Sequence, residues 1–365
     1  MIIKGINILN FKNIAEASLE FSDNVNCFVG MNGMGKSNFL DAIYYLSYGK
    51  SFSNMPDRMS VNHEAQFAML QGEYERRGER LDIYCAIQRG KRKVLKRDGK
   101  EYQRLSEHVG LLPLVMVSPL DWELLRGGSE ERRRFIDSII SQNNKEYLAA
   151  LIRYNKALEQ RNSMLRDGVS DALLFESVEM AMCVAASLIH DTRSKWIKEF
   201  TPIFHNLYTS IAGDGESVTL EYESALNGGT MAQILDANRQ RDAVLGYTSQ
   251  GVHRDDIELR LGDFSMRKIG SQGQCKTYTV ALRLAQYDFL CAISQHKPLL
   301  LLDDIFDKLD AARVQRIVSI VSRDRFGQIF ITDTNRQHID EIITHMGGDH
   351  KIFEVANGVA TPLIQ

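Results

Sequence analysis

The segment from Gly30 to Ser37 constrains the fold of this chain most. It spells GMNGMGKS and matches the pattern GxxxxGK[ST] at every fixed position. A short apolar run, 25–29, precedes it, and Phe39, Ile43 and Leu46 follow it at helical spacing. This order predicts a strand, a glycine loop and a helix, which is the architecture of a phosphate-binding loop in an α/β fold.

The residue types in this loop suit a nucleoside triphosphate. The glycines let consecutive backbone N–H groups face a phosphate, and the helix that begins near Lys36 adds the positive end of its dipole. Lys36 is placed to reach the β- and γ-phosphates, and the Ser37 hydroxyl to ligate Mg²⁺ between them. The alternative is a chance glycine-rich turn, and the agreement of motif and context argues against it. We therefore predict ATP and Mg²⁺ as cofactors, with the nucleotide-binding residues Gly30, Met31, Asn32, Gly33, Met34, Gly35, Lys36 and Ser37.

Two adjacent acids, Asp303 and Asp304, follow the apolar run 299–302. Such a run is typical of a strand buried on both faces of a parallel sheet, and ligands collect at the carboxyl ends of these strands. Asp303 is predicted to hold Mg²⁺ through water, and Asp304 to orient the attacking water or accept its proton. The alternative is that one acid merely caps the strand. Lys36 and Asp304 are therefore the predicted catalytic residues of a slow ATPase, since aspartate is one methylene shorter than glutamate and stands further from the water.

A second candidate phosphate contact precedes the amphipathic helix predicted over 275–294, and it consists of Ser271, Gln272, Gly273 and Gln274. Ser271 can cap that helix, and the free amides of the first turn can bind an anion. An ordinary helix cap explains serine and glycine at such a position as well. The place of this segment before the 299–304 strand favours the functional interpretation.

Composition limits how the chain can meet DNA or a membrane. Lys and Arg total 44 against 47 Asp and Glu, a formal net charge of -3, so any DNA contact must come from a local basic patch. One patch lies around 89–104, where Lys91, Arg92 and Lys93 are the candidate DNA contacts, and a solvated turn with charged flanks is the alternative. The five cysteines form no metal-binding pattern, and no apolar run is expected to approach the roughly 18 residues of a membrane span. We expect a soluble cytoplasmic protein without a membrane partner.

Patterning also divides the chain into two lobes. Strand-length runs over 1–21 predict a hairpin, and those over 67–104 predict a β-meander. Long helical patterns rich in Leu, Ala, Arg, Glu and Met then take over from about 121 to 207. We predict a discontinuous ATPase head, 1–115 and 246–365, and a mainly helical second lobe, 116–245.

Two further charged clusters have different predicted roles. Arg132, Arg133 and Arg134 lie beside two glutamates in a helical pattern, which predicts local ion pairs rather than a DNA contact. The segment 253–256, with the sequence HRDD, is expected to join the lobes and to hold polar contacts near the nucleotide.

Together these features resemble the ABC/SMC class of ATPases, and within it the RecF family. The resemblance implies an α/β fold, with an ABC/SMC-type P-loop ATPase head and a mainly helical second lobe. The motifs that carry it span nearly the whole chain in the family order, and they are Leu9–Asn13, Gly30–Tyr44, Gly49–Phe52, Gly127–Asp137, Gly251–Asp256, Ser271–Gln274 and Leu300–Asp310.

The resemblance also implies a function. In this class, the signature segment of one subunit, here Ser271–Gln274, closes over nucleotide held by the phosphate loop of the other, so a homodimer on ATP is implied. The RecF resemblance implies binding to duplex DNA at single-strand gaps, work with RecR, and help in loading RecA. The alternatives are an ABC-type transporter ATPase subunit and a structural SMC-like DNA organiser. The helical lobe suits the first poorly and is too short for the extended coiled coil of the second.

Three positions depart from the pattern of related ATPases. Leu120-Asp121 stands after Pro119, where the family usually has Glu-Asp. Asp307 stands where the RecF family has serine, in the loop that follows the carboxylate pair. The strand that ends at Thr332, Asp333 and Thr334 has no histidine where many ABC-type ATPases carry a γ-phosphate sensor.

Overall fold

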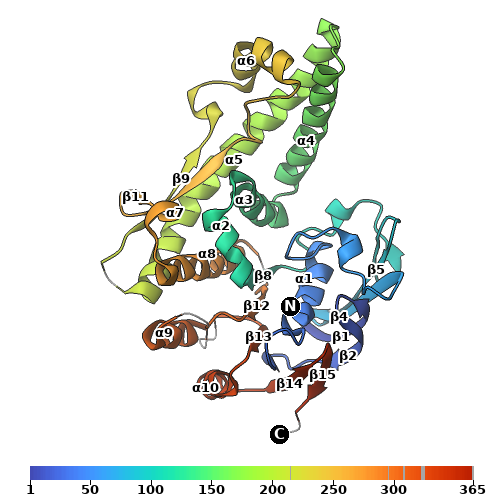
Figure 1. Ribbon diagram of the computed structural model, residues 1–365, viewed down its shortest axis with the longest axis vertical. Helices are drawn as coiled ribbons and strands as arrows, with labels where there is room; N and C mark the ends of the chain where they lie inside the picture. The colour runs from blue at the N-terminus through green and yellow to red at the C-terminus, as the bar shows by residue number, and fades with distance from the viewer. Residues whose placement is uncertain (214, 295, 307–308, 322–324, 364–365) are drawn as a thin grey trace. The chain divides into compact units, whose positions relative to one another are not determined.

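The computed structural model describes residues 1–213, 215–294, 296–306, 309–321 and 325–363. The chain divides into two compact units (Figure 1). The first unit contains Met1–Asp121, Ser210–Ala212 and Gln272–Gln365, and the second contains Trp122–Thr209 and Gly213–Ser271. Asp307 and Lys308 lie outside the described residues.

The unit boundaries differ from those expected from the sequence, and strand pairing explains the difference. β8 (Leu114–Val117) pairs in parallel with β12 (Leu299–Asp303), so the first unit continues past residue 115. β10 (Asp256–Leu261) pairs with β9 (Val218–Glu223), which keeps 246–271 in the second unit rather than in the head. A sequence pattern indicates that a strand is present but not which strand it pairs with.

A six-stranded sheet with the order β15-β14-β3-β13-β12-β8 organises the first unit. Besides β8 and β12, its strands are β3 (Val25–Val29), β13 (Ile329–Asp333), β14 (His350–Ala356) and β15 (Val359–Pro362). Neighbouring strands are parallel except for β14 with β15. β12 and β13 are buried along their whole length, as expected of apolar strands covered on both faces. The helices of this unit are α1 (Lys36–Tyr48), α8 (Gln272–Ile293), α9 (Ala311–Val321) and α10 (Arg336–Met346).

A second, antiparallel sheet of the first unit has the order β2-β1-β4-β5-β6-β7. Its strands are β1 (Ile2–Phe11), β2 (Ile14–Glu20), β4 (Phe67–Arg76), β5 (Glu79–Gln88), β6 (Val94–Arg97) and β7 (Lys100–Glu101). β1 and β2 form the predicted hairpin, and β4 to β6 form the predicted meander. One apolar core unites both sheets with α1, and it includes Ile6 and Leu70 from this sheet, Phe39 from the helix and Phe330 from the parallel sheet. The helix that follows the phosphate loop is therefore fixed by both sheets.

The second unit is mainly helical. Its helices are α2 (Trp122–Arg126), α3 (Ser129–Asn143), α4 (Lys145–Arg166), most of α5 (Ala172–Ala212), α6 (Met231–Leu245) and α7 (Met266–Ile269). A three-stranded sheet, β11-β10-β9, completes the unit, with β11 spanning Phe264–Ser265. Helix α5 is 41 residues long, and its N-cap residue Asp171 accepts hydrogen bonds from the amides of Leu173 and Leu174.

Helix α5 is also the one helix among the described residues that is long and apolar enough to cross a membrane by length and composition. Its most apolar window has a mean hydropathy of 1.8 and is 28% buried. This apolar stretch is longer than any that was expected from the sequence. The same helix carries Arg193, whose buried guanidinium pairs with Asp137 on α3 and with Asp255 just before β10. These ion pairs attach α5 to the other elements of the second unit.

Candidate nucleotide site

The carboxyl ends of three neighbouring strands meet at one edge of the parallel sheet. β13 lies between β3 and β12, and the register pairs Asp333 with Val29 and Asp303 with Thr332. The loop Gly30–Ser37 follows β3, and the carboxylate pair begins at the last residue of β12. The fold therefore brings the predicted phosphate loop and the predicted acids to the same edge, where ligands bind in open α/β sheets.

Backbone geometry explains the glycines of the loop. Gly33 and Gly35 have φ angles of 81° and 102°, in the left-handed region that favours glycine. A Cβ atom at Gly30 would lie 2.3 Å from the carbonyl oxygen of Val355 on β14. The loop cannot accept side chains at these positions without moving.

The Lys36 ammonium lies across this loop. Its Nζ donates hydrogen bonds to the carbonyl oxygens of Gly30 at 2.7 Å and Met31 at 3.0 Å. Burial lowers the pKa of Lys36, and the charges of Asp304 and Asp303 act in the opposite direction. The lysine is thus a cation held over the loop, where it can exchange its carbonyl contacts for phosphate oxygens.

Asp303 connects the phosphate loop to β13. Its Oδ1 accepts hydrogen bonds from Ser37 Oγ and from Thr332 Oγ1, each at 2.7 Å. Burial raises the pKa of Asp303, and the hydrogen bonds from Ser37 and Thr332 lower it. The sequence does not mark Thr332 as a site residue, because it reaches Asp303 only through strand pairing.

Ser37 and Asp303 fit a magnesium ion. In nucleotide sites Mg²⁺ is commonly held by one or two protein oxygens, water molecules and phosphate oxygens. The Ser37 hydroxyl and the Asp303 carboxylate are such oxygens, and they already lie in hydrogen-bond contact. The described residues contain no group of three or more His, Cys, Asp or Glu side chains that could hold a metal ion without a nucleotide.

Asp304 starts the loop after β12 in a left-handed backbone conformation, with a φ angle of 48°. Its amide donates to Thr332 Oγ1 at 3.0 Å and to the Thr332 carbonyl oxygen at 3.3 Å. Such a conformation costs a non-glycine residue on the order of 1–3 kcal/mol and persists only where the surroundings hold it. The hydrogen bonds to Thr332 on β13 help to hold this conformation of Asp304, the predicted general base.

Two β-turns hold the outer side of the phosphate loop. The amide of Gly358, in the turn between β14 and β15, donates to the carbonyl oxygen of Met34 at 2.8 Å. Asn13, in the turn between β1 and β2, donates to the same carbonyl at 3.4 Å and accepts from Asn38 Nδ2 at 2.7 Å. A side chain at Gly35 would collide with that of Asn13. No local motif predicts these contacts, since both turns are far from the loop in sequence.

The predicted signature segment lies at the start of α8. Ser271 and Gln272 are exposed, and Gly273 and Gln274 are partly buried. The division of the chain into units falls between Ser271 and Gln272. The exposed residues of the segment are therefore Ser271 and Gln272.

The comparisons with known proteins agree with this geometry. The family model described as RecF/RecN/SMC N terminal domain matches residues 2–359. The chain is 52% identical to the DNA replication and repair protein RecF of Parabacteroides distasonis over 363 residues, which is 100% of both chains. The chain belongs to the RecF family. The RecF of Porphyromonas gingivalis is 48% identical over 360 residues, covering 98% of this chain and 99% of that one.

Solved structures support the same family and the predicted fold class. A structure of the recombination mediator protein RecF with ATP, in the RecFOR pathway, superposes with a TM-score of 0.89 and 27% identity, covering 100% of this chain and 98% of that one. An Smc head domain from Pyrococcus furiosus shares the fold at a TM-score of 0.57 and 18% identity. The resemblance to RecF inferred from the motifs is confirmed, as is the ATPase-head fold with long helices.

The basic segment of this RecF-family chain is only partly available to DNA. Lys91 and Arg92 are exposed in the turn between β5 and β6. Lys93, in contrast, pairs with Asp57 at 2.9 Å and donates to the Gly49 carbonyl at 2.5 Å, and its side chain is 14% exposed. Lys93 therefore stabilises the fold next to the loop after α1, and its role as a DNA contact is not supported by its placement.

The second basic cluster forms ion pairs, as predicted. Arg132 binds Asp256 at 2.7 Å through Nε, and Arg134 binds Glu130 and Glu131 on its own helix. Arg133 donates to the backbone carbonyl oxygen of Asp255.

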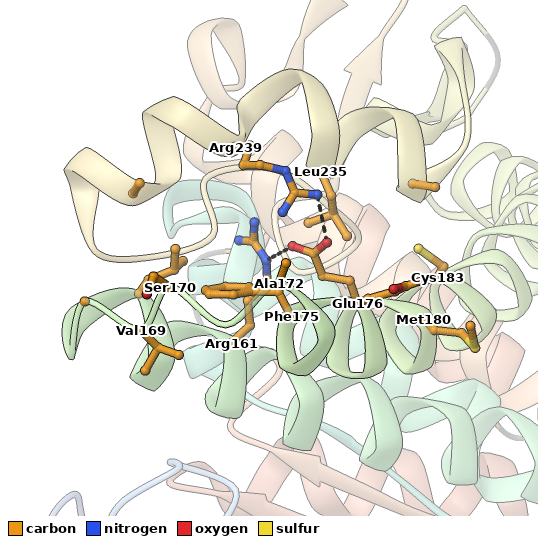
Figure 2. A pocket seen from close by; sticks show the side chains of 15 residues that line it. Arg161, Val169, Ser170, Ala172, Phe175, Glu176, Met180, Cys183, Leu235 and Arg239 are labelled. Carbon is orange, nitrogen blue, oxygen red and sulfur yellow. Dashed lines mark hydrogen bonds and ion pairs between the residues drawn. The ribbon is translucent and has the colours of Figure 1, made fainter.

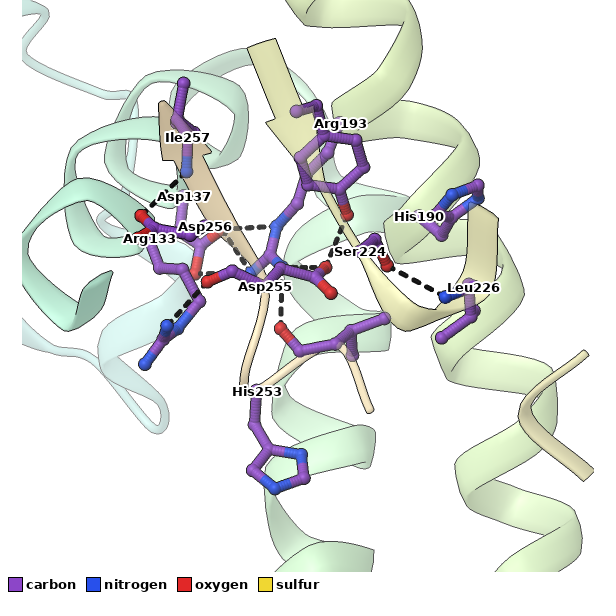
Figure 3. Close-up of polar contacts among 12 residues, drawn as sticks. Arg133, Asp137, His190, Arg193, Ser224, Leu226, His253, Asp255, Asp256 and Ile257 are labelled. Atoms are coloured by element: carbon purple, nitrogen blue, oxygen red, sulfur yellow. Dashed lines mark hydrogen bonds and ion pairs between the residues drawn. The ribbon is translucent and has the colours of Figure 1, made fainter. Parts of the chain in front are cut away.

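The segment 253–256 lies inside the second unit, in the polar network of Figure 3, and does not join the two units. Arg193 of α5 binds Asp255, Asp137 and the Val252 carbonyl oxygen. The expectation that this segment joins the lobes was wrong, because the pairing of β10 with β9 holds it in the second unit. The expected contact with the nucleotide stays a prediction.

The second unit also contains a pocket of about 930 Å³ with mainly apolar walls between α4, α5 and α6 (Figure 2). Glu179 accepts there from Arg161 Nε at 2.9 Å and from Arg239 at 3.1 Å. None of the predicted site residues lines this pocket.

Proposed function

We propose that this chain is an ATP-dependent DNA-binding protein of replication and repair that acts at single-strand gaps. The observation that carries the proposal is the assembly of Lys36, Ser37 and Asp303 at one sheet edge, where Ser37 Oγ lies 2.7 Å from Asp303 Oδ1. Membership of the RecF family supplies the biological setting, because its relatives are DNA replication and repair proteins.

At this edge each residue has a distinct task. The loop amides and Lys36 bind the phosphates, and Ser37 with Asp303 holds the Mg²⁺ ion, which when bound neutralises charge on the β- and γ-phosphate oxygens. Asp304 orients the attacking water and accepts its proton, so that the water attacks in line with the bond to the leaving oxygen. The short aspartate side chain favours slow, switch-like turnover, below roughly 10 per second.

ATP also acts as the link between two copies of the chain. The signature segment Ser271–Gln274, of which Ser271 and Gln272 are exposed, contacts the γ-phosphate held by the loop of the partner copy. Because the helix start offers N–H donors to an anion, ATP is preferred over ADP in this contact. Hydrolysis then separates the two copies.

The DNA contact and the protein partners follow from the family. Lys91 and Arg92 are the exposed basic residues we assign to the phosphates of gapped duplex DNA. RecR-type and RecA-type proteins are the proposed partners, and the cytoplasm is the proposed compartment.

The decisive experiment measures retention of fluorescent gapped duplex DNA with ATP, with ADP and without nucleotide. We expect ATP to strengthen binding in the wild-type chain and to have no effect in Lys36→Met, because that variant loses the phosphate contact. Lys297→Met is the matched control, since its ammonium also donates to a backbone carbonyl, that of Phe326, away from the site. Indifference of the wild-type chain to DNA in all three conditions would favour a transporter-type ATPase subunit instead.

A further inference from the structure

The N-terminal part of α8 contacts the backbone of Asp304. Lys276, two residues after the signature segment, donates from Nζ to the Asp304 carbonyl oxygen at 3.1 Å. Both residues belong to the first unit. A lysine of the signature helix therefore touches the residue proposed as general base in the same chain.

Asp304 needs such support. Its φ angle of 48° places it in the left-handed region, which is unfavourable for a residue with a Cβ atom. Its amide is held by Thr332 on β13, at 3.0 Å from Oγ1. Its carbonyl is held by Lys276 on α8. The amide and the carbonyl of Asp304, which together define the direction of its side chain, are thus each hydrogen-bonded to a different element.

The contacts form a continuous path from the phosphate loop to the signature helix. Ser37 and Thr332 both donate to Asp303, Thr332 accepts from the amide of Asp304, and Lys276 donates to the Asp304 carbonyl. Each step is a hydrogen bond of 2.7–3.1 Å. Asp304 therefore lies on a chain of hydrogen bonds between the phosphate loop and α8.

Gly273, at the start of α8, lies next to a side chain of α9. A Cβ atom at Gly273 would lie 2.9 Å from Nη1 of Arg313 on α9. Arg313 in turn pairs with Asp310, whose carboxylate also accepts from the Arg313 amide and caps α9. The start of α8 therefore lies beside the N-terminus of α9.

We propose that Lys276 is a positioning residue that holds Asp304 in its left-handed conformation and so couples contact at the signature segment to hydrolysis in the same chain. This inference rests on the proposed ATPase function. Without Lys276 the Asp304 backbone relaxes toward a more favourable conformation, and its carboxylate turns away from the attacking water. Phosphate binding by Lys36 and Ser37 does not depend on this contact.

The first test replaces Lys276 by methionine, which keeps the apolar stem and removes the donor. We expect kcat for ATP to fall about 10- to 100-fold, the loss typical of a misplaced reacting group, while the Kd for a fluorescent ATP analogue stays within about twofold. Lys276→Arg retains a donor and should recover part of the lost rate. Lys297→Met, which loses a comparable lysine-to-carbonyl bond elsewhere, should keep the wild-type kcat.

The second test separates positioning from a general loss of structure. In a double-mutant cycle, Lys276→Met should have no further effect on kcat in an Asp304→Asn background, because its effect passes through the missing carboxylate. An equal fractional loss in both backgrounds, or a wild-type kcat in Lys276→Met, overturns the inference. If the wild-type chain neither binds nor hydrolyses ATP, the proposed function itself fails, and the inference fails with it.

Discussion

At the scale of single residues, the stability of the fold depends most on buried charged and titratable groups. Lys36 and Asp303 are both buried at the candidate site, and each is hydrogen-bonded. In the second unit, Arg193 is fully buried and paired with two aspartates, and breaking such a pair leaves an uncompensated charge. His253 differs from these groups, since burial keeps it neutral.

His253 makes the stability of the second unit dependent on pH. Its Nδ1 accepts from the Tyr154 hydroxyl at 2.7 Å, and its Nε2 donates to the Thr248 carbonyl at 3.0 Å. Burial lowers the pKa of His253 to about 4, below the value of 6.5 in the unfolded chain. As pH falls from 6.5 toward 4, the unfolded state takes up a proton that the folded state does not, so stability is lost on acidification.

We therefore expect the urea midpoint of the wild type to fall between pH 7 and pH 5 more than that of His253→Gln, whose amide can replace both hydrogen bonds. Tryptophan fluorescence reports this unit, because both tryptophans, Trp122 and Trp196, lie in it. Equal pH dependence in His253→Gln and wild type would contradict the prediction.

At the scale of elements, turns from distant parts of the chain shape the phosphate loop. The loop follows β3, but its outer carbonyl, at Met34, is bound by the β1–β2 and β14–β15 turns. Gly358 can make this contact because it has a φ angle of 79° and no side chain. A Cβ atom at Gly358 would lie 2.2 Å from the Asn13 carbonyl oxygen.

Gly358→Ala should weaken ATP binding, because the turn must move away from Asn13 and release Met34. We expect roughly a tenfold increase in Kd for a fluorescent ATP analogue, equivalent to the loss of about one hydrogen bond. Gly99→Ala is the control, since Gly99 has a similar φ angle of 77° but nothing within 4 Å of the added atom. An unchanged Kd in Gly358→Ala would show that the turn does not support the loop.

Local patterns in the sequence predict the phosphate loop, the Asp303–Asp304 pair, the first hairpin and the 67–104 meander. Each of these features depends on neighbouring residues, so spacing is sufficient. Thr332, Lys276 and Gly358 are different, because they reach the site through strand pairing or packing over long distances in sequence. Ion pairs are equally hard to predict from the sequence. A basic run does not indicate which of its lysines pairs with an aspartate of the same chain, as Lys93 does with Asp57.

At the scale of the whole molecule, the candidate site in one chain contains the phosphate loop and the acids, while Ser271 and Gln272, at the start of α8, are exposed. In the proposed dimer that helix start completes the site of the partner copy. The nucleotide would then be both substrate and interface.

Ser271→Glu tests this arrangement, because its negative charge repels the γ-phosphate of the partner copy and leaves the phosphate loop of its own chain intact. By size-exclusion chromatography with light scattering, the 41.5 kDa wild-type chain should double its mass with ATP, and the variant should stay monomeric. Both should bind the ATP analogue with similar Kd. Ser177→Glu, at an exposed position on α5, should dimerise as the wild type does. Dimerisation of Ser271→Glu with ATP would exclude this role for the segment.

The discontinuity of the first unit has a consequence for biosynthesis. β3 and the phosphate loop leave the ribosome early, but their neighbours in the sheet, β13 and β14, are among the last segments to be translated. A nascent or prematurely terminated chain therefore carries the complete GxxxxGKS motif without the strands that fix its geometry. We expect such fragments to be unable to capture nucleotide, so that only a finished polypeptide competes for ATP in the cell.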